Sequence, residues 1–194
     1  MTSHRSLTLL VTQPDLANSM PERWDTLETC HIFFVHRGVG LVDQDWSGLP
    51  SGQRVYCMVD HEKYRGPPPH ATNHAGGLAT LGRLVHESEG VWSLPHGREP
   101  LEHRRPVIGL SMLLDRQPEL AREGLRIAVG LAGCDVPVTL FAETPRPWRT
   151  LQDLGHLQPD AKEFIDILIA LGMFQDDSFI PDAPPVNRMG MLQL

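Results

Sequence analysis

The chain has 194 residues, of which 41% are hydrophobic and 21% charged, a composition typical of a globular protein with one substantial core or two small ones. The formal net charge of -7 leaves no broad cationic surface for a phosphate backbone, so we expect no nucleic-acid partner. The longest apolar stretches, such as 31–35 and 138–142, are far shorter than the roughly 20 residues of a spanning helix, and residues 1–12 lack a signal-peptide pattern. These features predict a cytoplasmic protein with no membrane partner.

The first half of the chain alternates between strand and helix patterns. Residues 6–12 form a short apolar run that ends in a Gln-Pro-Asp turn, which is typical of a buried strand. A helix capped by Asn18 or Ser19 is expected next. The elements expected after it are strands at 31–35 and 54–59, a proline-rich loop over 66–77, a helix ending at residue 87 and a strand at 91–94.

The second half repeats this alternation after a polar, proline-punctuated segment. That segment, 96–106, is the best candidate for a linker. Beyond it we expect a strand over 107–114, an amphipathic helix over 118–132, a strand over 136–143 and a helix from 159 or 160 to about 174. Residues 175–194 show no periodicity, which predicts a loosely attached or disordered arm whose Met and Leu residues are available to a partner.

Two β-α-β arches are therefore expected, at 6–35 and 107–143, and crossovers of this length are what parallel strands require. We interpret them as a diverged internal duplication. The predicted fold class is α/β, with a mainly parallel sheet and helices on both faces. We expect the strand over 107–114 to join the sheet of the first arch, because the second half has too few strands for a complete sheet. Ligands should collect at the carboxyl ends of the strands.

The common nucleotide-binding and hydrolase motifs are missing from the sequence. The glycines of Gly38-Val39-Gly40 follow a predicted strand, but they do not form the GxGxxG pattern that receives a pyrophosphate. The chain also contains no Walker A, HExxH or GxSxG sequence. These absences lower the expectation of an NTPase or a motif-bearing hydrolase, and no cofactor is indicated.

Histidine is abundant, with ten residues, and two groups of histidines stand out. His61, His70 and His74 surround the proline-rich loop and are candidate ligands for zinc or iron. Their spacing matches no motif, so scattered surface histidines are the simpler interpretation and we predict no metal. His31 and His36 bracket the second strand and fall on opposite faces by period-two counting. At least one of this pair should be structural.

The three cysteines include no CxxC pair, which indicates neither a disulfide framework nor a thiolate zinc site. Cys57 is predicted to lie inside the third strand, shortly before Asp60 and His61, and a thiolate there would be a strong nucleophile. The alternative is a small buried side chain with a packing role. Cys30 and Cys134 stand at the amino ends of predicted strands, where we expect structural roles.

One arrangement of motifs resembles a known family. A β-α-β arch is followed by the segment His36-Arg37-Gly38-Val39-Gly40-Leu41, then by the strand Arg54-Val55-Tyr56-Cys57 and by Arg65-Gly66. This order resembles the sulfur-relay family of the DsrE, DsrF and DsrH proteins and their Tus counterparts. Residues 1–95 look most like the DsrH branch, although Arg37 and Gly40 replace an acidic and an aromatic residue of that branch. Residues 107–174 resemble the opening of a DsrE or DsrF subunit.

The resemblance implies a role in handling sulfane sulfur. Members of the family that transfer sulfur carry it as a cysteine persulfide, and here the implied carrier is Cys57, with His61 and Arg65 stabilising the thiolate. Arg37 and Gly38 would bind the ligand at the same rim. The implied partners are further copies of this chain, related DsrE-like subunits or a sulfur-carrier protein.

The sequence leaves open whether the chain is an enzyme, such as a carrier of the sulfurtransferase type. A noncatalytic structural or regulatory subunit of the same fold is the main alternative. A histidine-based, metal-dependent enzyme is a further one.

Overall fold

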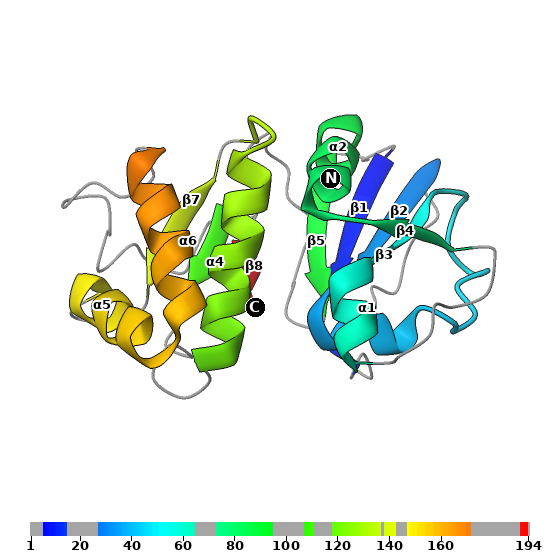
Figure 1. The fold of residues 1–194 in the computed structure, drawn as a ribbon. Coiled ribbons are helices and arrows are strands. Elements are labelled where there is room, and N and C mark those ends of the chain that lie inside the picture. The colour runs from blue at the N-terminus through cyan, green and yellow to red at the C-terminus, as the bar shows by residue number, and fades with distance from the viewer. Residues whose placement is uncertain are drawn as a thin grey trace. The chain divides into compact units, whose positions relative to one another are not determined.

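Two compact units make up the chain in the computed structural model, residues 1–104 and 105–194. The residues that the structure describes are 6–14, 27–64, 73–94, 107–110, 118–136, 138–142, 147–171 and 191–193. Each unit has a sheet of its own (Figure 1). The expectation that the strand after the linker joins the first sheet is therefore wrong, because that strand, β6 (Val107–Leu110), pairs with two strands of the second unit.

The first unit is built on a five-stranded sheet with the order β4-β3-β2-β1-β5. Every neighbouring pair in it is parallel, which confirms the predicted α/β class with a mainly parallel sheet. The strands are β1 (Ser6–Val11), β2 (Thr29–Phe34), β3 (Arg54–Cys57), β4 (His74–Gly76) and β5 (Gly90–Leu94). The chain adds β2, β3 and β4 outward on one side of β1 and then returns to place β5 on the other side.

Both faces of this sheet carry buried side chains. On one face, alternate residues of β1, β2 and β3 form an apolar cluster with the short 3-10 helix η1 (His36–Leu41) and the residues after it. The other face packs against α2 (Leu78–Glu87), where the Thr8 hydroxyl donates a hydrogen bond to the carbonyl oxygen of Leu84. Burial of both faces explains why β2 reads as a continuous apolar run rather than an alternating one.

The largest local departure from the sequence-based prediction follows β3. The apolar run 54–59 was predicted to be one strand, but the strand ends at Cys57 and α1 (Met58–Tyr64) begins at the next residue. A short apolar run does not by itself distinguish a strand from the first turn of a helix. Strand β4 lies in a segment expected to be loop, because its three residues carry no apolar pattern. The helix expected from residue 18 or 19 lies largely outside the described residues.

The second unit contains a three-stranded parallel sheet with the order β7-β6-β8, and its described residues include three helices. Besides β6, its elements are α4 (Pro118–Ala132), β7 (Thr139–Ala142), α5 (Pro147–Leu157), α6 (Pro159–Ala170) and β8 (Met191–Gln193). Helix α6 packs against both α4 and α5, and α4 contacts β6 (Figure 1). The core of the second unit includes the buried side chains of Leu125, Leu131, Leu151 and Leu168.

Strand β8 is the third strand of this sheet, and the sequence did not predict it. It belongs to the arm 175–194, which was expected to be loosely attached, yet its residues pair with β6. In each unit the first strand thus lies between the second strand and the last, all parallel. Within the described residues, no helix is long and apolar enough to cross a membrane.

Candidate functional site

The carboxyl ends of β1, β2, β3 and β4 meet at one edge of the first sheet, where parallel α/β sheets generally bind ligands. The segments that follow these strands are, in turn, Thr12, η1, α1 and the first turn of α2. This edge is therefore the place to test the residues that the sequence singled out.

Helix η1 folds back over the end of β1 through Gly38. The amide of Gly38 donates to the carbonyl oxygen of Thr12 over 3.0 Å, and the amide of Val35 donates to that of Val11 over 2.9 Å. A Cβ atom at Gly38 would collide with the carbonyl oxygen of Val11, so glycine is needed there for close packing. The ligand-binding role predicted for Gly38 stays a prediction.

Asp60 joins α1 to η1. Its Oδ2 atom accepts a hydrogen bond of 2.8 Å from the backbone N–H of His36. His36 adopts a left-handed backbone with φ of 53°, a conformation that costs a non-glycine residue roughly 1–2 kcal/mol. Both side chains are buried, with Asp60 only 5% exposed. The carboxylate therefore holds the turn at the end of β2 in its strained form.

Two aromatic contacts add to this attachment of α1. The rings of His36 and Tyr64 meet edge to face at 5.2 Å between centroids, and the rings of Tyr56 and His61 lie 5.0 Å apart. His61 is 2% exposed, so it is a packed core residue of α1. A helix of seven residues is marginal alone, and these contacts are what stabilise it here.

Cys57 lies at the carboxyl end of β3 and is 2% exposed. Its register partner on β4 is Gly76, and α2 begins two residues later at Leu78. Neighbouring strands are about 4.8 Å apart, so the N-terminus of α2 lies close to the end of β3. The N-cap of α2 is Gly77, which has no side chain that could accept hydrogen bonds from the amides of the first turn.

The predicted partners of Cys57 are differently placed. Successive side chains of a strand point to opposite faces, so the Cys57 side chain points away from Tyr56, the residue against which the His61 ring packs. Arg37 is exposed on η1, and Arg65 lies outside the described residues. The His61 ring therefore packs on Tyr56 rather than beside the Cys57 thiol. The proposed stabilisation of a Cys57 thiolate by Arg37 or Arg65 stays a prediction.

The other two cysteines are not part of the segments that form this edge. Cys30, the second residue of β2, is fully buried, and burial raises the pKa of its thiol to about 11 despite the nearby Arg54 guanidinium. Cys134 is half-buried in the turn after α4. A protonated, enclosed Cys30 fits the structural role that its position at the amino end of the strand predicted.

Among the described residues, no group of three or more His, Cys, Asp and Glu side chains is placed to hold a metal. Of the three loop histidines, His61 is buried in α1, His74 is exposed on β4, and His70 lies outside the described part of the chain.

A separate open pocket of about 430 Å³ lies beside the residues that follow η1, between Trp46 and Arg54. The guanidinium of Arg54 already donates to the carbonyl oxygens of Cys30 and Pro50, over 2.7 and 3.3 Å. The pocket also adjoins the first residue of β3, at the end of the strand opposite to the usual ligand edge. We therefore assign the functional candidate to the carboxyl edge.

Sequence reasoning missed the role of Asp60, which was noted only as a residue that follows Cys57. Its partner His36 lies 24 positions away, and no local pattern marks such a pair.

Comparison of the chain with family models, with curated proteins and with solved structures finds no match.

Proposed function

We propose that this chain is a sulfur-relay protein of the DsrE-like class, in which Cys57 receives a sulfane sulfur and passes it on. One observation carries the proposal: Cys57 is the last residue of β3, beside Gly76 and the start of α2. The sequence had placed this thiol inside a strand. Its position at the strand end brings it to the edge where the family resemblance calls for a persulfide cysteine.

The chemistry at Cys57 is a thiol exchange without net oxidation. The Cys57 thiolate attacks the terminal sulfur of a donor persulfide, R–S–SH; a new S–S bond forms at Cys57, the S–S bond of the donor breaks, and the thiolate RS⁻ leaves. A second thiolate then removes the terminal sulfur from Cys57 in the same way. Thiolate and persulfide are both anions, and the N-terminus of α2 favours negative charge beside β3.

Burial of Cys57 imposes a condition on this chemistry. At 2% exposure, the thiol meets a donor only when part of the edge opens. An enclosed site has the advantage of shielding a persulfide from solvent oxidants between acceptance and delivery. Local opening, rather than thiol exchange, should then limit the rate of transfer.

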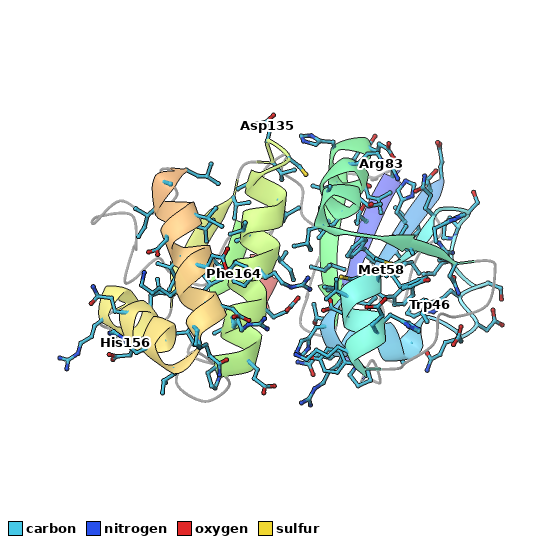
Figure 2. All side chains as sticks on the ribbon, in the orientation of Figure 1. Trp46, Met58, Arg83, Asp135, His156 and Phe164 are labelled. Atoms are coloured by element: carbon cyan, nitrogen blue, oxygen red, sulfur yellow. The ribbon has the colours of Figure 1, made fainter. Side chains whose placement is uncertain are left out.

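A second candidate function is a noncatalytic subunit of a DsrE-like assembly, and the surface of α1 favours it. Met58 and Val59, directly after the buried Cys57, are 51% and 62% exposed. Figure 2 labels Met58 at the start of α1. Neighbouring exposed apolar side chains are typical of surfaces that contact other proteins. In this alternative the thiol only packs, and α1 contributes to contact between subunits.

The arrangement of the second unit supports the same family assignment. Its strands β7, β6 and β8 occupy the relative places of β2, β1 and β5, which fits a DsrH-like half fused to a partial DsrE or DsrF-like half. Since β3 and β4 have no counterparts among the described residues of this unit, the proposal places sulfur handling in the first unit alone.

The proposal is tested on the full chain with glutathione persulfide as the donor and intact-mass spectrometry as the readout. We expect the wild-type chain to gain the mass of one sulfur atom, and we expect a Cys30→Ser, Cys134→Ser double variant to gain it as well. The Cys57→Ser variant should gain none. Uptake that persists in Cys57→Ser, or a wild-type chain that takes up no sulfur, overturns the relay role and leaves the noncatalytic subunit.

A further inference from the structure

A second group of interactions lies at the opposite, amino edge of the first sheet, around His31. The backbone N–H of Gln53 donates a hydrogen bond of 3.1 Å to Nδ1 of His31. An imidazole nitrogen accepts a hydrogen bond only when it carries no proton, so this contact requires neutral His31 with its proton on Nε2. His31 is 9% exposed, which makes it a buried titratable group outside the sulfur site.

The segment that His31 contacts is the connection 50–53, which leads into β3. This connection runs along β2: the amide of Cys30 donates to the carbonyl oxygen of Ser51 over 3.1 Å, and the amide of Ile32 donates to that of Gln53 over 2.8 Å. Gly52 approaches the Cys30 carbonyl so closely that a Cβ atom would not fit. The His31 bond is one of several that align the connection with the strand.

Charged groups from two neighbouring elements face His31. Arg54 comes from β3, while Arg83 and Glu87 come from α2. Figure 2 labels Arg83 on this helix. Arg83 forms an ion pair of 2.6 Å with Glu87 and also donates to Oε1 of Gln53 over 2.7 Å. Gln53 therefore links the connection to His31 through its backbone and to α2 through its side chain.

These surroundings determine which protonation state is stable in the fold. Burial lowers the pKa of His31, the Glu87 carboxylate opposes that shift, and Arg83 and Arg54 add to it. The neutral imidazole is thus the folded form at neutral pH. A group with a lowered pKa contributes stability above its ordinary pKa of about 6.5, and the contribution is lost as the pH falls through the folded value.

We propose that His31 is a pH-sensitive latch on the connection 50–53. In its neutral form it accepts the Gln53 amide and keeps the connection on β2. Once protonated, it can only donate, so it releases Gln53 and turns toward Glu87, competing with Arg83 for that carboxylate. Acidification therefore loosens the amino edge of the sheet and the last turn of α2 together.

The test is hydrogen exchange measured by mass spectrometry on the full chain at about pH 7.5 and about pH 5. After correction for intrinsic exchange rates, we expect residues 50–54 of the wild-type chain to lose protection about tenfold at the lower pH, the effect of one lost hydrogen bond. Residues of β1 should lose less. Unchanged protection of residues 50–54 in the wild-type chain overturns the proposal.

Two variants assign the effect to His31. The His31→Gln side chain can accept a hydrogen bond at both pH values, so its connection should show no acid-induced loss of protection. His86→Gln, which replaces an exposed histidine of α2, is the matched control and should respond to acid as the wild-type chain does. An acid response that is retained in His31→Gln, or abolished in His86→Gln, contradicts the latch.

Discussion

The bond between Asp60 and the backbone of His36 gives the sharpest prediction about stability. Replacing Asp60 with Ala removes an acceptor that lies 2.8 Å from a buried N–H and leaves that group without the bond that fixes a left-handed φ. A hydrogen bond to a charged group contributes about 1.5–3 kcal/mol. We expect Asp60→Ala to lower the free energy of opening of η1 by about 2 kcal/mol, and Asp60→Asn by about half as much, because its amide oxygen still accepts.

Native-state hydrogen exchange of the amides of β2 and η1 measures this effect in the first unit alone. The expected loss in Asp60→Ala corresponds to exchange faster by roughly thirtyfold, since each 1.4 kcal/mol is about a factor of ten. Glu62→Ala is the matched control, because Glu62 is an exposed carboxylate on the same helix. If Asp60→Ala exchanges within about twofold of the wild-type chain, or no faster than Glu62→Ala, the role assigned to Asp60 is wrong.

Three other predictions concern packing and charge. Gly38→Ala should lower the melting temperature sharply, since its Cβ would collide with a β1 carbonyl oxygen; a melting temperature equal to that of the wild-type chain would contradict this close approach. With a thiol pKa of about 11, Cys30 should resist iodoacetamide at neutral pH while the chain is folded, which peptide mass mapping checks. In α4, Arg126→Met should cost the second unit about 3 kcal/mol in urea unfolding because it leaves the buried Glu123 without its ion pair, while Arg122→Met should cost under about 1 kcal/mol because the Asp160 partner is exposed.

The strength of the local pattern decided which parts of the fold were predictable. Helix α4 matches its predicted bounds at 118–132, because its apolar side chains recur at helical spacing over many turns. Strands β1 and β2 were recognisable as short apolar runs between turn signals. Strands β4 and β8 have three residues each and take their conformation from the strands beside them, so no local pattern marks them.

The candidate site was predictable only in its composition. The sequence identified Cys57 and His61 as residues of interest, but their surroundings depend on where β3 ends and α1 begins. The strand was predicted to end at residue 59 and ends at Cys57, and this two-residue difference decides whether the thiol lies inside a strand or at the edge of the sheet. The packing of His61 on Tyr56 and the bond from His36 to Asp60 arise from tertiary contacts, which one sequence does not display.

The most direct test of the sulfur-relay account follows one sulfur atom onto Cys57 and off again. The full chain is treated with glutathione persulfide, freed of the donor, digested and analysed by mass spectrometry, and a second portion is first exposed to free cysteine. The account predicts a persulfide on the peptide that contains Cys57, and its disappearance in the second portion with formation of cysteine persulfide. An unmodified Cys57 peptide, or a persulfide found on Cys30 or Cys134 instead, would contradict it.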